Sequence, residues 1–134
     1  MRKTIDTNIL VRALVDENDV QSRIAVQCLT GESVHVPVTV MLETEWVLRS
    51  SYGLGREIIC SLLGSLLSLR NVEVDQRDSV GAAIAAHGAG FDFADALHLQ
   101  SSKGSASFLT FDLRLRKLAL KQGSPIPVEM PGMH

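Results

Sequence analysis

Four acidic residues stand at positions where a carboxylate could do chemistry. Asp6 and Asp112 each follow a short strand-like run, Glu43 lies on a predicted helix, and Asp95 lies in the first turn of another. Carboxylate clusters of this kind suit hard divalent cations such as Mg²⁺ and Mn²⁺, which prefer oxygen ligands. An ion held in this way lowers the pKa of a bound water and stabilises the oxygens of an in-line phosphoryl displacement. The residue types therefore indicate a metal site for phosphoryl chemistry.

Two neighbouring glutamates compete for the second of these positions. On a helix predicted from Thr39 to Tyr52, Glu45 and Arg49 have the i,i+4 spacing of a solvent-exposed pair, and we expect Glu45 on the surface. Glu43 lies beside a different stripe and is expected to point inward. A buried carboxylate without a partner costs several kcal/mol, so a metal ion is the expected neighbour of Glu43. The pattern favours Glu43, with Glu45 as the alternative.

The segment around Asp95 begins a second predicted helix. Asp92 and Asp95 are spaced i,i+3, which is typical of a capping residue followed by a first-turn acid. Ala94 and Ala96 are small and would let a ligand approach Asp95 closely. Asp92 is either a cap or a support for the site. His98, three residues after Asp95, is expected to be a solvated histidine rather than a general base.

The elements that position these acids alternate between strand and helix. Predicted strands lie at residues 3–5, 34–38, 72–74, 108–111 and 126–128. Predicted helices lie at residues 9–15, 20–29, 39–52, 56–69, 79–86, 91–102 and 113–122, with Thr7 and Asn8 at the start of the first. This order predicts an α/β fold with a short, mostly parallel central sheet flanked by helices. Functional crevices of such sheets lie beyond the carboxyl ends of the strands, so Asp6 and Asp112 are expected at one edge.

Length and composition restrict the class of protein. The chain has 134 residues, 46% hydrophobic and 21% charged, with a formal net charge of −2. These values predict one domain over residues 1–134, whose last ~8 residues are a Pro/Gly-containing tail. They exclude a disordered chain and a strongly basic nucleic-acid binder. Few aromatic residues argue against a base-stacking platform, and Trp46 is expected in the core.

Membrane and export signals are not expected from the pattern of apolar residues. The apolar run after the N-terminal basic residues is too short for a signal peptide, and the longest apolar stretch, Ile58 to Leu69, is too short to span a bilayer. The sequence therefore predicts a cytoplasmic protein with no membrane partner.

Basic residues form one stripe on the last predicted helix. Arg114, Lys117 and Lys121 recur at helical spacing and begin two residues after Asp112. They are either an ordinary solvated face or a track for an RNA backbone. His35, by contrast, has no neighbouring ligand in the sequence and is expected on the surface.

Four short motifs, taken in order, resemble those of the PIN-domain ribonucleases, and among these the VapC toxins of bacterial toxin–antitoxin pairs. The motifs are Ile5-Asp6-Thr7-Asn8-Ile9-Leu10, Leu42-Glu43-Thr44-Glu45-Trp46-Val47-Leu48, Asp92-Phe93-Ala94-Asp95-Ala96-Leu97 and Thr110-Phe111-Asp112. They occur in the family's order and extend from residue 5 to residue 112. The resemblance therefore covers most of the chain and implies a single PIN-like domain.

The resemblance also implies an activity and partners. It implies a Mg²⁺- or Mn²⁺-dependent endoribonuclease that leaves a 5′-phosphate and a 3′-hydroxyl. The implied catalytic and metal-binding acids are Asp6, Glu43, Asp95 and Asp112, with Thr7, Asn8, Asp92 and Thr110 in support. The implied partners are a small VapB-like antitoxin, an RNA substrate such as tRNA or rRNA, and a second copy of the chain. The alternative is a PIN-like module that binds protein or RNA without cutting.

Overall fold

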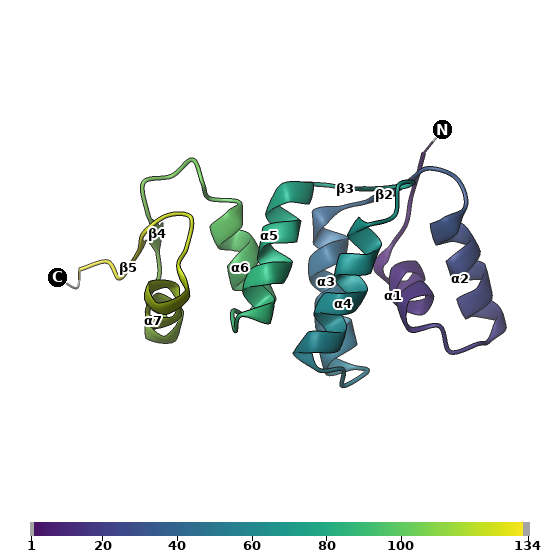
Figure 1. Ribbon diagram of the computed structural model, residues 1–134, viewed down its shortest axis with the longest axis horizontal. Coiled ribbons are helices and arrows are strands. Elements are labelled where there is room, and N and C mark those ends of the chain that lie inside the picture. The colour runs from purple at the N-terminus through teal and green to yellow at the C-terminus, as the bar shows by residue number, and fades with distance from the viewer. Residues whose placement is uncertain (1, 133–134) are drawn as a thin grey trace. The chain divides into compact units, whose positions relative to one another are not determined.

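The computed structural model describes residues 2–132, which divide into two compact units at the boundary between Arg77 and Asp78. The first unit holds three strands and four helices (Figure 1). In chain order its elements are β1 (Lys3–Thr4), α1 (Thr7–Val15), α2 (Val20–Thr30), β2 (Val34–Val36), α3 (Val38–Ser50), α4 (Arg56–Leu67) and β3 (Val72–Val74).

The strands of the first unit form a parallel sheet in the order β1-β2-β3. Thr4 is paired with His35, and Val34 with Val72. Parallel neighbours need a crossover, and a helix pair supplies each one: α1 and α2 join β1 to β2, and α3 and α4 join β2 to β3. Val34 and Val36 are buried on one face of β2, while His35 is only partly buried.

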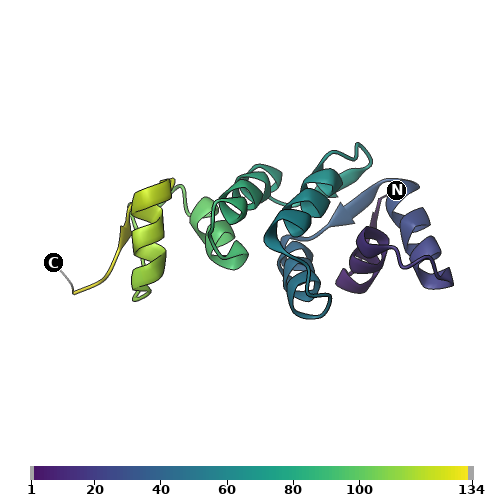
Figure 2. The same cartoon turned by 60° about the horizontal axis from the view of Figure 1, so that its bottom comes forward.

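The core of the first unit lies where these helices meet the sheet. α1 contacts both α2 and α3, and α3 contacts α4. Figures 1 and 2 show α1 and α2 side by side. The largest side chains that are fully buried here are Leu10, Met41, Leu48, Ile59, Leu63 and Leu66. Complete burial of each such side chain contributes about 1.5–3 kcal/mol, so helix packing on the sheet stabilises the unit.

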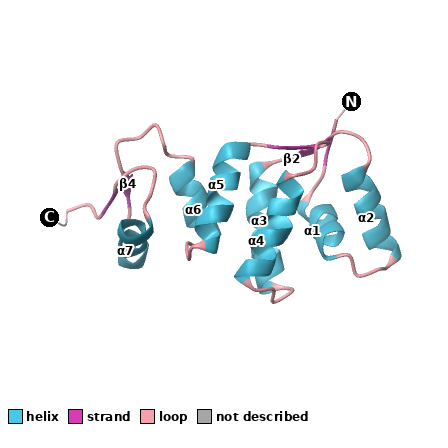
Figure 3. Cartoon of the chain, in the orientation of Figure 1, coloured by secondary structure: helices cyan, strands magenta, loops and turns pink. Residues whose placement is uncertain are grey.

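The second unit is built mostly from helices (Figure 3). Its elements are α5 (Arg77–Gly88), α6 (Phe93–Gln100), β4 (Phe108–Leu109), α7 (Leu113–Gln122) and β5 (Val128–Glu129). The first residue of α5, Arg77, still belongs to the first unit. β4 and β5 pair in parallel, and α7 is the crossover between them. Within α5 and α6, His87 and Phe93 meet edge to face with ring centroids 5.8 Å apart. His87 is buried and its Nδ1 lies 2.7 Å from the carbonyl oxygen of Phe91, which ties the end of α5 to the start of α6.

The predicted α/β class with a short parallel sheet is confirmed. The pairing differs from the prediction in one respect, because the described strands form two sheets: β1 belongs to the sheet of the first unit and β4 to that of the second. The expectation that Asp6 and Asp112 lie at one edge stays a prediction. Of the predicted tail, residues 133 and 134 lie outside the described part.

Helix starts differ from the predictions by one or two residues. α1 begins at Thr7 and its N-cap is Asp6, not Thr7 or Asn8. α3 begins at Val38 after Pro37, so the predicted cap Thr39 lies inside the helix. Pro37 is the N-cap, with φ −62°, and it makes no side-chain capping bond. Its carbonyl oxygen accepts hydrogen bonds from the backbone N–H groups of Val40 and Met41.

Three predictions about single side chains are wrong. Glu45 is buried, with 3% of its surface exposed, and Trp46 is 55% exposed. The α3 helix is thus rotated relative to the orientation that the Glu45–Arg49 spacing suggested. His35 is not a free surface residue, because its ring lies 2.9 Å from Thr4 Oγ1 and 2.8 Å from Asp75 Oδ1. Among the helices of residues 2–132, none has the length and apolar character needed to cross a membrane.

Candidate active site

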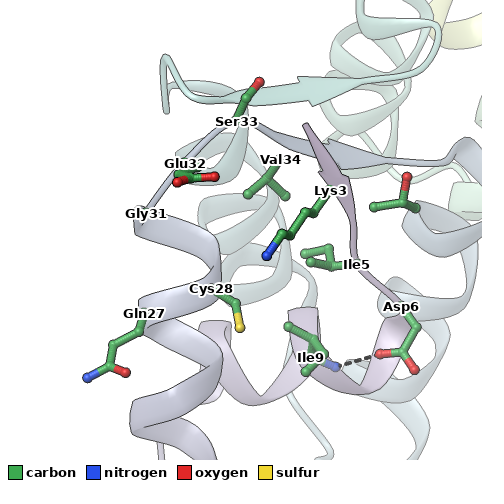
Figure 4. A pocket seen from close by; sticks show the side chains of 11 residues that line it. Lys3, Ile5, Asp6, Ile9, Gln27, Cys28, Gly31, Glu32, Ser33 and Val34 are labelled. Atoms are coloured by element: carbon green, nitrogen blue, oxygen red, sulfur yellow. Dashed lines mark hydrogen bonds between the residues drawn. The ribbon is translucent and has the colours of Figure 1, made fainter. Parts of the chain in front are cut away.

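Asp6 occupies the first position after β1 and caps α1. Its Oδ1 accepts a hydrogen bond from the backbone N–H of Ile9 at 3.0 Å (Figure 4). This contact satisfies one of the unpaired N–H groups at the helix start and fixes the carboxylate beside it. The side chain remains exposed, so its second oxygen is accessible to a ligand.

Glu43 lies on α3, and its side chain contacts the start of α1. The hydroxyl of Thr7 donates a hydrogen bond to Glu43 Oε1. Thr7 is 9% exposed, so this hydroxyl is itself held by packing. Glu43 is exposed rather than buried, and the inward orientation that the sequence predicted is correct only in the sense that Glu43 faces α1.

Asp6 and Glu43 line the same pocket, here called the carboxylate pocket. It has a volume of about 430 Å³ and lies between α1 and α3. Its polar and aromatic lining consists of Asp6, Thr7, Asn8, Arg12, Glu43 and Tyr52. The structure therefore brings together the acids that the sequence predicted for the first unit, with both of their predicted supporting neighbours.

Glu45 is directed elsewhere. Its Oε2 accepts a hydrogen bond from Arg49 Nε at 2.9 Å, and it does not line the carboxylate pocket. Two positions along an α-helix correspond to a rotation of about 200°, so Glu43 and Glu45 face nearly opposite ways. The arrangement favours Glu43 over Glu45 as the site acid, as the sequence did, although for a different reason.

In the second unit, Asp92 and Asp112 both cap helices. Asp92 accepts a hydrogen bond from the backbone N–H of Asp95 at 3.1 Å at the start of α6. Asp112 accepts one from the backbone N–H of Leu115 at 3.0 Å at the start of α7. Thr110 supports the second cap, because its Oγ1 accepts a hydrogen bond from the backbone N–H of Asp112 at 3.0 Å.

Asp95 is the acid whose environment most disfavours its charge. Partial burial raises the pKa of Asp95, the negative charges of Asp92 and Asp112 raise it further, and nearby His98 lowers it. Asp92 and Asp112 are therefore each close enough to Asp95 to disfavour its negative charge. A bound divalent cation would relieve this repulsion, which is a common feature of metal and catalytic sites.

The donor chemistry of both units suits a hard cation, since every candidate ligand is a carboxylate. The structure groups Asp6 with Glu43 in the first unit, and Asp92, Asp95 and Asp112 in the second. Within residues 2–132, however, no three Asp, Glu, His or Cys side chains lie close enough to form a metal site by themselves. In the first unit Asp6 and Glu43, and in the second unit Asp95 and Asp112, offer carboxylate oxygens of the kind that a divalent metal ion requires.

A second hollow in the second unit is lined by cations and is here called the cationic hollow. It has a volume of about 380 Å³ and is formed by Gly90, Arg114, Lys117, Leu118 and Lys121. Gly90 has φ +118°, and a Cβ there would lie 3.8 Å from Leu118 Cδ1, so this turn lies against α7. None of the three cations forms an ion pair with another described residue. The stripe predicted from the sequence is thus exposed and concave.

A larger pocket of about 620 Å³ lies between β1 and α2, away from Glu43. Figure 4 shows Lys3 and Cys28 pointing into this space, with Ile5, Ile9 and Val34 along it and Asp6 at its end. It contains one site acid, whereas the smaller carboxylate pocket contains two. The chemistry therefore favours the smaller pocket.

The sequence interpretation missed Arg12 and Tyr52. Both line the carboxylate pocket. Arg12 follows Asn8 by four residues, so the two share a face of α1, and this i,i+4 spacing was a usable signal. Tyr52 lies in the turn after α3, and nothing in the sequence pattern links that turn to Asp6.

Comparison with known families places this geometry in a class. The model of the PIN domain family matches residues 3–121, which extend across both units. The chain therefore belongs to the PIN domain family, whose members are generally metal-dependent nucleases. No curated protein shows significant similarity to the chain.

Proposed function

We propose that the protein is a Mg²⁺- or Mn²⁺-dependent endoribonuclease that uses Asp6, Glu43, Asp95 and Asp112 as its catalytic acids. The observation that carries the proposal is the carboxylate pocket of a PIN-family chain, in which Thr7 holds Glu43 next to Asp6. The mutual repulsion around Asp95 supports it, because carboxylates that repel one another favour a bound cation.

Each residue has a defined part in this reaction. When bound, the metal supplies a water of lowered pKa and stabilises the charge on the phosphate oxygens. Asp6 and Asp112 present carboxylates fixed by backbone N–H groups at helix starts, while Thr7 orients Glu43.

Asp92 and Thr110 hold the backbone around Asp95 and Asp112. Asn8 orients the neighbouring Arg12, with Nε 3.3 Å from Asn8 Oδ1.

The positive charge of the cationic hollow is evidence for a polyanionic substrate. A chain with a net charge of −2 needs local positive charge to attract RNA, and Arg114, Lys117 and Lys121 provide it on one face of α7. We propose these three residues as contacts to the RNA backbone.

The cellular role we propose is that of a VapC-type toxin in the cytoplasm. The support is the ordered set of motifs within the PIN-family match. This role implies a VapB-like antitoxin, tRNA or rRNA as substrate, and a homodimer. Leu113 and Leu120, which are 46% and 74% exposed on α7, offer apolar surface for such a partner.

Cleavage of total RNA by the purified protein tests the activity. Discrete fragments are expected with Mg²⁺ or Mn²⁺ and are expected to disappear with EDTA or in the Asp95→Asn variant. Asp78→Asn is the matched control, because Asp78 is an exposed acid in the first turn of α5 in the same unit. Cleavage that persists in EDTA would contradict the proposal.

A thermal-shift titration with Mg²⁺ or Mn²⁺ distinguishes the proposed nuclease from a PIN-like module that does not cut RNA. A nuclease is expected to be stabilised by the metal, and Asp95→Asn is expected to reduce that stabilisation. Absence of both cleavage and a metal-dependent shift would indicate the non-catalytic PIN-like module instead.

A further inference from the structure

The carboxylate pocket contains a cation and an aromatic ring besides its acids. Arg12 is the basic residue in its lining, and Tyr52 is the aromatic residue. A metal site alone requires neither, since its ligands are oxygen atoms. Both groups are, however, common contacts of single-stranded RNA: guanidinium groups bind phosphates, and aromatic rings stack on bases.

The position of Arg12 is set by contacts outside the acid pair. Its Nε donates to Asn8 Oδ1 at 3.3 Å, which directs the side chain back along α1 toward the first turn of the helix. Its ion pair is with Asp19 at the start of α2, where Nη1 and Oδ2 are 3.9 Å apart. That separation is too long for a hydrogen bond. Arg12 thus lies in an acidic pocket while its ion-pair partner is neither of the two acids.

A guanidinium has five N–H donors in a planar fork that matches the geometry of a phosphate. The contact with Asn8 uses one of them. The hydrogen bond from the backbone N–H of Ser22 lowers the pKa of Asp19, so Asp19 is a charged but distant competitor for Arg12. A phosphate that enters the pocket can therefore take donors from Arg12 without breaking a short ion pair.

Tyr52 is held at the other wall by the backbone of the turn after α3. Its N–H donates to the carbonyl oxygen of Val47 at 3.3 Å, and the chain then turns at Gly53 with φ +63°. Tyr52 is only partly buried and lines the carboxylate pocket, which places it within reach of a ligand in that pocket. A single ring of this kind stacks on one base and contributes about 1–3 kcal/mol to binding in single-strand binders.

We propose that Arg12 and Tyr52 form a subsite for one nucleotide of single-stranded RNA, next to the bond that is cut. Arg12 binds a backbone phosphate, and Tyr52 stacks on the base. This inference rests on the proposed function, since it assigns part of the RNA to the same pocket. It makes Arg12 and Tyr52 substrate-binding residues and leaves metal binding to the acids.

RNA binding tests the subsite without relying on cleavage. A short fluorescent single-stranded oligoribonucleotide of mixed sequence is titrated in Mg²⁺ with the Asp95→Asn protein, which is expected not to cut it. On this background, Arg12→Gln is expected to weaken binding about tenfold. The slope of log affinity against log salt is expected to fall by about 0.7 for one lost phosphate contact on a single strand. Arg12→Lys is expected to retain the slope and lose part of the affinity.

Variants of Tyr52 are expected to change RNA affinity in a different way from variants of Arg12. Tyr52→Leu is expected to weaken binding about fivefold or more and to leave the salt slope unchanged, because stacking releases no counterions. Tyr52→Phe retains the ring and is expected to bind like the parent. Arg23→Gln is the matched control for lost charge, because Arg23 is an exposed arginine on α2 in the same unit and does not line the pocket.

A variant of Asp19, the ion-pair partner of Arg12, distinguishes a purely structural role of Arg12 from a role in RNA binding. Asp19→Asn retains a good helix cap and removes the ion pair, so it is expected to leave RNA affinity intact or slightly higher. If Asp19→Asn weakened RNA binding as much as Arg12→Gln, Arg12 would only tie α1 to α2, and the subsite would be wrong. Unchanged affinity in Arg12→Gln would also refute it. Absence of RNA binding by the parent itself would overturn the proposed function.

Discussion

In the first unit, Glu43 accepts a hydrogen bond from a buried hydroxyl and lies in a pocket that also contains a guanidinium. In the second unit, the negative charges of Asp92 and Asp112 both disfavour the charge of Asp95. The first arrangement holds its acids in place before any ligand arrives. The second stores unfavourable charge that a cation would relieve. The first unit thus orients Glu43 through a buried side chain, whereas the second unit places negative charge around Asp95.

The comparison is sharpest on α3, where one acid faces the pocket and its neighbour does not. Glu43→Gln is expected to lower the rate of RNA cleavage by about 1,000-fold, because it removes a metal-binding charge while retaining the side-chain shape. Glu45→Gln is expected to change the rate less than about twofold and to lower the free energy of unfolding by about 1 kcal/mol, because Glu45 is buried against Arg49. Cleavage rates and urea unfolding of both variants measure this. The reverse result would assign the site to Glu45.

The two threonines differ in what they hold. Thr7→Val removes the hydroxyl that orients Glu43 and is expected to weaken metal binding by about 10–100-fold, as loss of such supporting hydrogen bonds does. Thr110→Val removes an acceptor for the backbone N–H of Asp112 and leaves the carboxylate cap intact, so its effect is expected to be smaller. Titration with Mn²⁺, followed by thermal shift, compares them. Equal losses would mean that the first unit is no more preorganised than the second.

The pockets of the two units also differ in positive charge, because one arginine lines the carboxylate pocket and three cations line the cationic hollow on α7. Lys117→Gln with Lys121→Gln is expected to reduce the salt slope of RNA binding by about 1.4 if both lysines contact phosphates of a single strand. Metal binding is expected to be unchanged. Anisotropy titrations at several salt concentrations measure the slope. An unchanged slope would make the stripe an ordinary solvated helix face.

The smallest expected effect is on stability. Because the pKa of Asp95 is raised in the folded state, the folded protein binds more protons than the unfolded chain between the ordinary and the raised value. Without metal, the free energy of unfolding is therefore expected to fall as pH rises through that window and to stay lower above it. Asp95 is only partly buried, so solvent screens its charge and the difference is about 0.5 kcal/mol or less. Asp95→Asn is expected to remove this dependence in urea unfolding in EDTA. A dependence that persists would place the repulsion on another acid.

The elements were predictable to the extent that local patterns determine them. The bounds of β3 and α7 match the predictions, because alternating valines and helical leucine spacing need no knowledge of distant residues. The Asp92 cap is local too and was one of the two roles expected for that residue, whereas the caps Asp6 and Asp112 were not predicted. The pairing of the strands was harder to predict, because whether β1 and β4 share a sheet depends on contacts between distant segments.

Side-chain exposure was the weakest part of the sequence interpretation. The i,i+4 spacing of Glu45 and Arg49 correctly predicts their contact but not that Glu45 is buried. A helix wheel orders residues around the axis, but which side faces the core is set by the packing of α4 and α1 on α3. Trp46 is exposed for the same reason.

The sequence by itself determined the types and order of the acids, the helices and strands that carry them, and the family to which the chain belongs. Only the tertiary structure decided that Glu43 meets Thr7, that Glu45 does not face the pocket, and that Arg12 and Tyr52 lie beside Asp6. Local hydrogen bonds, such as helix caps, and helix periodicity act over a few residues, so they can be predicted from the sequence alone. The neighbours of a side chain in a pocket come from packing between α1 and α3, which joins residues more than thirty positions apart.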